Sequence, residues 1–150
     1  MSPQGWEIAD YLLSRDDSTF QFFGGSTFRI KLGNSSNELD DNALIQIADR
    51  LLDWFVASVK RRDAPPVLRK LCSTLAFICT LDREIDTQTI VRRVILSIVH
   101  GKAIGFAVHD LPDPDDAFAS LTEAQLSALL WFLTALTEEI SKENAVKDAR

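Results

Sequence analysis

Apolar side chains recur three and four residues apart along almost the whole chain of 150 residues. This spacing places them on one face of an α-helix, because a helix turns once about every 3.6 residues. No segment shows the sustained alternation of apolar and polar residues, bounded by hairpin turns, that is typical of a half-buried strand. The pattern therefore predicts an all-α fold.

The composition indicates a folded chain and excludes several kinds of partner. Hydrophobic residues make up 46% of the chain, with only 6 Gly and 5 Pro. Sixteen basic residues against 22 acidic ones give a net charge of -6, which disfavours the broad basic surface that nucleic acids or anionic membranes require. No apolar run reaches the roughly 18 residues of a membrane span, and no signal-peptide pattern opens the chain. We expect an intracellular protein that binds neither nucleic acid nor membrane.

The two cysteines, Cys72 and Cys79, are expected to be separate thiols in the core. Seven residues apart on a helix, they would lie about 10.5 Å apart along its axis. A disulfide allows no more than about 7 Å between Cα atoms. With only His100 and His109 besides, and no metal-ligand spacing, we expect neither a metal site nor a cofactor.

Capping signals and periodicity predict four helices in the first half of the chain. The first two are expected at about residues 5–14 and 18–33. The third should follow the acidic run that begins at Glu38 and end near Lys60, and the fourth should begin at Pro65.

Two more helices are predicted on either side of a long loop. The fifth is capped by Asp86 and ends near Gly101, with Arg92 and Arg93 facing outward. Residues 101–119 form an acidic, proline-rich loop, which is either a variable surface loop or an insertion that contacts a basic cargo. The sixth helix opens with Ser120-Leu-Thr-Glu, a capping box, and runs to about Ile140, before a polar tail.

Alternate helices start about 46 residues apart. Ser18 to Ala64 is 46 residues and Asp41 to Asp86 is 45, which is the period of HEAT or armadillo repeats. This predicts three antiparallel helix pairs at residues 5–33, 39–80 and 85–143. Side-chain repetition between the pairs is weak, so the period alone leaves a plain helical bundle as an alternative.

No catalytic arrangement is evident. Gly24-Gly25-Ser26 lacks the lysine of a phosphate-binding loop, and His109 has no nucleophile motif nearby. Glu138 and Glu139 are adjacent, so a helix would point them about 100° apart, as solvated side chains. We expect a protein without enzymatic activity.

Two runs resemble a known family. Phe22-Phe-Gly-Gly-Ser-Thr-Phe-Arg-Ile-Lys-Leu32, preceded by Trp6-Glu-Ile-Ala-Asp-Tyr-Leu-Leu13, resembles the N-terminal HEAT repeats of importin-beta-type nuclear transport receptors. Val67-Leu-Arg-Lys-Leu-Cys-Ser-Thr-Leu-Ala76 is similar to the next inner helix of the same family, in its importin-thirteen and transportin-SR branch.

The resemblance implies a segment of a HEAT-repeat superhelix in which the helices from Ser18, Pro65 and Ser120 are the inner ones. In this family the inner surface binds the GTPase Ran in its GTP form, while protein cargo and the phenylalanine-glycine repeats of nucleoporins use other surfaces. Candidate Ran-facing residues are Arg29, Lys31, Arg69 and Lys70.

The implied function is Ran-GTP-regulated import or export of cargo through nuclear pores, by a receptor that shuttles between nucleus and cytoplasm. Since family members are several times longer, we expect the chain to be a fragment of a longer solenoid. The alternative is a HEAT or armadillo scaffold of a cytoplasmic complex unrelated to Ran, and an α-helical enzyme domain is a more distant one.

Overall fold

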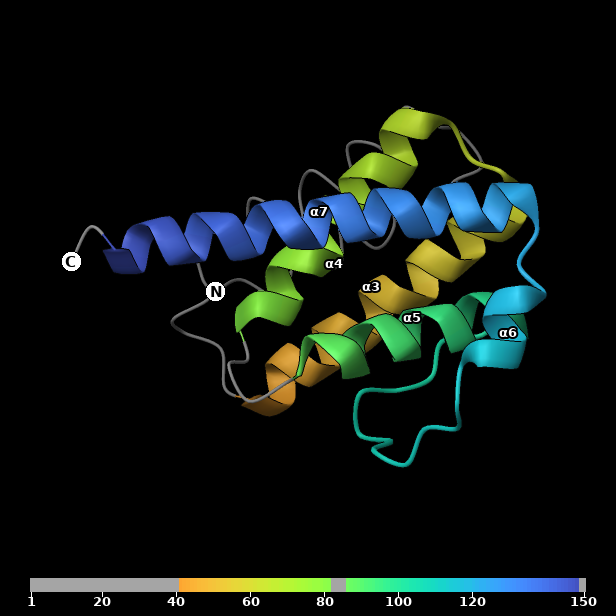
Figure 1. The fold of residues 1–150 in the computed structure, drawn as a ribbon, viewed down its shortest axis with the longest axis horizontal. Helices are drawn as coiled ribbons and strands as arrows, with labels where there is room; N and C mark the ends of the chain where they lie inside the picture. The colour runs from red at the N-terminus through yellow and green to blue at the C-terminus, as the bar shows by residue number, and fades with distance from the viewer. Residues whose placement is uncertain (1–40, 82–85, 149–150) are drawn as a thin grey trace.

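The computed structural model describes residues 41–81 and 86–148. All regular structure in these residues is α-helical, which confirms the all-α prediction. The helices are α3 (Asp41–Arg61), α4 (Pro65–Leu81), α5 (Thr87–His100), α6 (Asp115–Ala119) and α7 (Glu123–Asp148) (Figure 1). The helices predicted at residues 5–14 and 18–33 lie outside the described residues.

A tight turn connects α3 to α4. The N–H of Arg62 donates to Val59 O at 3.2 Å and that of Asp63 to Ser58 O at 3.1 Å, the two hydrogen bonds of a Schellman motif. Arg62 has φ 55, in the left-handed region where glycine is usual. Helix α4 then begins at Pro65, as predicted, because proline suits a first turn in which its missing N–H needs no partner.

Helix α5 has the predicted limits. The side chain of Asp86 accepts a hydrogen bond from Gln88 N at 3.4 Å. At the other end Gly101 has φ 71, and its N–H donates to Ser97 O and Ile98 O. This left-handed position is the one at which a glycine costs least.

The segment before α7 differs from the prediction in two ways. Residues 101–119 are not one continuous loop, because the last five form α6. The cap of α7 is Thr122 rather than Ser120: Thr122 Oγ1 accepts from Gln125 N at 3.2 Å, and Gln125 Oε1 accepts from Thr122 N at 2.9 Å. Ser120 Oγ instead donates to Ala117 O. The helix end predicted near Ile140 is also wrong, since α7 continues into the polar tail as far as Asp148.

The helices run alternately in opposite directions. Figure 1 shows α3 and α5 running one way and α4 and α7 returning. The most extensive packing joins α4 to α7, followed by α3 to α4. Helices α4 and α7 are neighbours, and α3 and α5 contact each other. This arrangement is consistent with a segment of a HEAT-like α solenoid.

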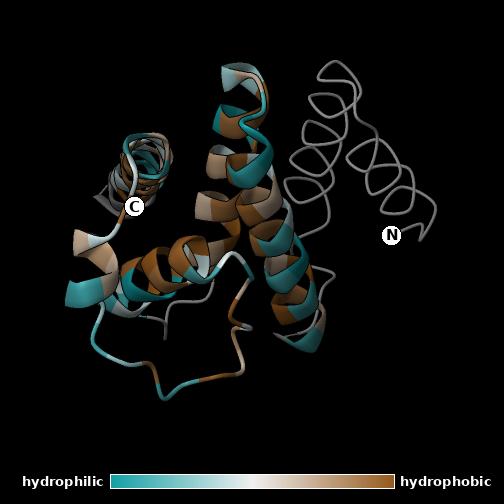
Figure 2. Cartoon of the chain, turned by 90° about the vertical axis from the view of Figure 1, so that its right-hand side faces the viewer, coloured by the Kyte–Doolittle hydropathy of each residue, from teal (hydrophilic) through white to brown (hydrophobic). Residues whose placement is uncertain are grey.

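One continuous core lies between these helices, where hydrophobic residues gather in Figure 2. Its largest fully buried side chains include Phe55 of α3, Leu75 of α4, Val94 of α5 and Phe132 of α7. Phe55 and Phe132 contact each other with ring centroids 6.2 Å apart. Both cysteines are free thiols buried in this core, as predicted.

The leucines of α7, which recur at helical spacing, are only partly buried. Leu129 and Leu136 are buried, but Leu126 is 37% and Leu130 53% exposed. Phe118 of α6 is also exposed. Within residues 41–81 and 86–148, none of the helices combines the length and apolar character needed to span a bilayer.

Candidate functional site

The groove between α4 and α7 is the candidate binding surface. Leu68 near the start of α4 faces the same hollow as Ala128, and Cys72, one turn further, faces a second hollow with Ala135. The contacts advance along both helices together, so α4 and α7 are parallel neighbours. We call this surface, from Leu68 and Ala124 to Cys72 and Glu138, the α4/α7 groove.

Trp131 divides the groove into two hollows. Its half-buried indole lines both of them. The Leu68 hollow, of about 430 Å³, has an apolar lining from Val59, Leu68, Ala124 and Ala128. The Cys72 hollow, of about 320 Å³, is lined by Cys72, Ser73, Thr134, Ala135 and Glu138. Both volumes fall in the range of small ligand sites.

Arg69 lines the Cys72 hollow, beside Trp131. Its guanidinium carbon is 5.3 Å from the centroid of the Trp131 ring, a cation–π contact that holds both side chains in place. Arg69 is nevertheless exposed to solvent. It is therefore a positive charge fixed at the surface of the groove.

Arg69 is the one predicted site residue that the structure places at this groove. Lys70 follows it on α4 and is half-buried. Adjacent residues on a helix point about 100° apart, so the two cations do not share one face. Arg29 and Lys31 lie outside the described residues, and whether they join Arg69 stays a prediction.

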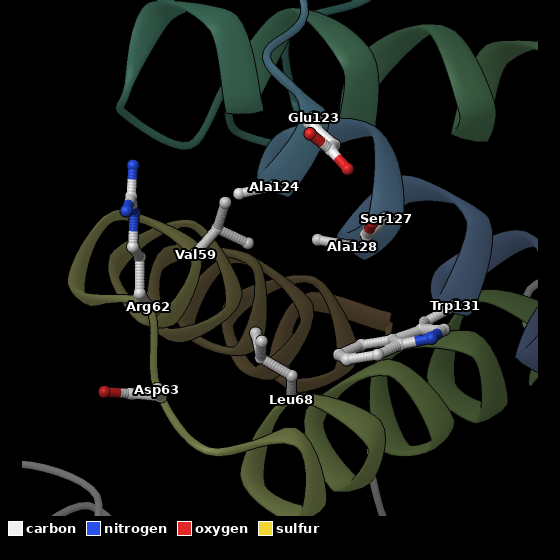
Figure 3. Close-up of a pocket in the computed structure, with 9 residues that line it drawn as sticks. All are labelled: Val59, Arg62, Asp63, Leu68, Glu123, Ala124, Ser127, Ala128 and Trp131. Carbon is white, nitrogen blue, oxygen red and sulfur yellow. The ribbon is translucent and has the colours of Figure 1, made fainter.

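The far end of the Leu68 hollow carries a strained arginine. The left-handed backbone of Arg62 ends α3, and its exposed side chain stands beside Val59 (Figure 3). The neighbouring Asp63 points away, because its carboxylate accepts from Ser58 Oγ at 2.7 Å and from Arg61 at 2.8 Å. Asp63 is thus neutralised by Arg61 rather than by Arg62.

A second polar cluster joins the 101–114 segment to the helices. Arg93 was predicted to face outward with Arg92, and this is wrong, since Arg93 is only 3% exposed. Its guanidinium donates to three carbonyl oxygens, those of Gly105, Val108 at 2.8 Å and Ile104 at 3.5 Å. These carbonyls of the folded-back segment make the burial of a positive charge possible.

Two further side chains complete this cluster. Asp49 of α3 accepts from Phe106 N at 2.7 Å, and Ser97 of α5 accepts from Ile104 N at 3.0 Å. Arg93 also lies over the Phe106 ring at 5.0 Å. Burial lowers the pKa of the Arg93 guanidinium, while the charge of Asp49 opposes that shift. The cluster fixes the first part of the segment to α3 and α5.

The cysteine and glutamate side chains form no reactive site among the described residues. Burial raises the pKa of both the Cys72 and the Cys79 thiol to about 12, so neither is a nucleophile at neutral pH. Glu138 is exposed as predicted, but Glu139 is buried, 3.6 Å from Lys142. In the part of the chain that the structure describes, His, Cys, Asp and Glu residues form no group of three that could hold a metal ion.

The sequence contained a signal for two residues that the predictions missed. Arg93 lies three residues after Ile90 and four before Ser97, both buried, which puts it on the inner face of α5. Trp131 follows Ala128 by three residues, on the side of α7 that packs against α4. No sequence pattern indicates the left-handed backbone of Arg62.

Comparison with known proteins gives one relative for part of the chain. Importin beta-like protein kap111 from Schizosaccharomyces pombe (strain 972 / ATCC 24843) is 33% identical over 89 residues, which are 58% of this chain and 8% of that protein. The chain therefore spans a small part of the relative that it matches. No family model matches it, and no solved structure does. The similarity supports the importin-beta family at most, without distinguishing a branch.

Proposed function

We propose that this chain is a segment of a nuclear transport receptor that binds Ran in its GTP form through the α4 side of the α4/α7 groove. Such a receptor acts by binding and not by catalysis, and it shuttles between nucleus and cytoplasm. Cargo and the phenylalanine-glycine repeats of nucleoporins would bind other surfaces of the same superhelix. The importin-thirteen and transportin-SR branch remains the specific family proposal.

The observation that carries this proposal is the parallel packing of α4 against α7 in a chain similar to an importin beta-like protein. In a solenoid, equivalent helices of successive repeats line up on one surface, which then offers an extended binding face. We propose α3 with α4 as one repeat and α5 with α7 as the next. On this assignment α4 and α7 are the inner helices.

Arg69 gives the α4 side of the groove an exposed positive charge. It remains exposed although Trp131 restrains it, so its charge is available to an acidic partner without much further loss of side-chain freedom. Because the whole chain carries a net charge of -6, local basic groups favour one orientation of such a partner.

A pull-down with purified Ran tests the proposal. The chain is immobilised, and Ran loaded with a non-hydrolysable GTP analogue is compared with Ran loaded with GDP at equal concentrations. We expect greater retention of the GTP form. Equal retention of the two forms would favour the alternative, a HEAT or armadillo scaffold of a cytoplasmic complex, which has no reason to distinguish the nucleotide.

A further inference from the structure

The Cys72 hollow holds two opposite charges that come from different helices. Arg69 of α4 and Glu138 of α7 both line it, and both are exposed to solvent. In the part of the chain that the structure describes, no ion pair joins them. Glu138 is not neutralised by the lysine one turn further along α7 either, because Lys142 pairs with Glu139 at 3.6 Å.

Trp131 explains why Arg69 and Glu138 are apart. The guanidinium carbon of Arg69 lies over the indole, 5.3 Å from the ring centroid, and the indole itself packs against the core. Trp131 and Glu138 are seven residues apart on α7, on the same side of the helix. An arginine held over the indole is therefore about two helical turns, or roughly 10.5 Å, from the backbone of Glu138.

The two possible contacts of Arg69 have different consequences for the charge of the groove. At exposed sites a cation–π contact and an ion pair stabilise by similar amounts, so neither excludes the other by strength alone. An ion pair with Glu138 neutralises Arg69. The ring of Trp131 holds the same charge without cancelling it and leaves guanidinium N–H groups for a partner.

We propose that Glu138 is an internal competitor for Arg69, and that Trp131 is a positioning residue that keeps Arg69 away from it. With Arg69 over Trp131, the α4 side of the groove presents a positive charge. With Arg69 paired to Glu138, that charge is cancelled within the chain. The identity of the partner rests on the proposed function, but the competition itself does not.

Reaction with phenylglyoxal measures the availability of Arg69 in the whole chain. This reagent modifies accessible arginines, and mass spectrometry of peptides gives the rate at each one. Trp131→Leu should lower the rate at Arg69 about 2- to 5-fold, which is the effect of an exposed ion pair with Glu138. If the indole only covered Arg69, its removal would raise the rate instead.

Three further variants separate positioning from a general structural effect. Trp131→Leu combined with Glu138→Gln should restore the wild-type rate, because the competing carboxylate is gone. Trp131→Phe keeps an aromatic face and should retain that rate as well. Glu138→Gln alone should change nothing, since Arg69 is held by the indole in the wild type. Arg50, which lies over Trp54 of α3 at 5.4 Å, is the reference whose rate every variant should keep.

The same variants are then titrated with GTP-loaded Ran. The affinity should fall about 2- to 5-fold in Trp131→Leu and recover when Glu138→Gln is added. Failure of the wild-type chain to bind Ran would contradict the proposed function alone, because the phenylglyoxal rates still decide this inference.

An unchanged or raised rate at Arg69 in Trp131→Leu would overturn the inference. So would a lowered rate that Glu138→Gln does not restore, or a rate that Glu138→Gln alone increases. A thermal melt of each variant, followed by circular dichroism, confirms that the rates are measured in a folded chain.

Discussion

Arg92 and Arg93 are adjacent in the sequence, but their surroundings differ sharply. Arg92 is half-buried, whereas Arg93 is enclosed and donates to carbonyl groups of the segment that follows α5. The position of Arg93 on the inner face could be predicted from helical spacing. Its acceptors could not, because they are backbone atoms of an irregular segment between 11 and 15 residues further along.

Arg93→Met should destabilise the chain by about 3 kcal/mol. The substitution removes the donor of three carbonyl groups and the charge beside the Asp49 carboxylate. Urea unfolding followed by circular dichroism measures the loss. Arg92→Met is the control and should change the free energy of unfolding by less than about 1 kcal/mol; equal losses in the two variants would show that Arg93 does not hold the segment.

The two thiols predict a loss of stability at alkaline pH. Burial raises the pKa of each to about 12 in the folded chain, above an ordinary value of 9.0. Their contribution is therefore complete below about pH 9 and is lost between about pH 9 and 12, because only the unfolded chain releases those protons.

Cys72→Ala isolates this effect. Between pH 8 and pH 10.5 the free energy of unfolding of the wild type should fall by about 2 kcal/mol more than that of the variant, at about 1.4 kcal/mol per pH unit. Urea titrations at the two pH values measure the difference. Identical pH dependence of the two proteins would mean that the Cys72 thiol ionises as readily in the folded chain as in the unfolded one.

At the scale of elements, the start of α7 shows where capping signals become ambiguous. Ser120-x-x-Glu123 and Thr122-x-x-Gln125 both have the form of a capping box. The structure uses the second, because α6 occupies residues up to Ala119 and Ser120 ends that helix. The starts of α4 and α5 were predicted correctly, because Pro65 and Asp86 mark them without ambiguity.

Thr122→Ala should destabilise the chain by about 1 kcal/mol, since it removes the oxygen that accepts from Gln125 N. Ser120→Ala is the matched control and should cost less than about 0.5 kcal/mol, because its hydroxyl only donates to an exposed carbonyl. Thermal unfolding distinguishes the two variants. A larger effect of Ser120→Ala would indicate that Ser120, as first predicted, caps α7.

At the scale of the whole molecule, the fold class and the limits of α3, α4 and α5 follow from periodicity and caps. The exposed face of α7 does not. Leu126 and Leu130 belong to the same apolar stripe in the sequence as Leu129 and Leu136, and spacing alone cannot say which part of a broad stripe meets a neighbour. A stripe this broad is typical of a solenoid helix that is covered on more than one side.

Leu129→Gln and Leu130→Gln test this division of α7. The first places an amide in the core and should cost about 3 kcal/mol or more. The second replaces a side chain that is 53% exposed and should change stability by less than about 0.5 kcal/mol. Denaturant unfolding compares them, and equal destabilisation would mean that another part of the chain covers Leu130.

The central proposal is that the α4 side of the α4/α7 groove, where Arg69 is exposed, is a binding surface for Ran. The most direct measurement is the affinity of the chain for GTP-loaded Ran, by isothermal titration, before and after the double substitution Arg69→Glu and Lys70→Glu. We predict at least about 10-fold weaker binding by the double variant, with Arg92→Glu on α5 as the control that keeps the wild-type affinity. An unchanged affinity of the double variant, or equal affinities for the GTP and GDP forms, would contradict the claim.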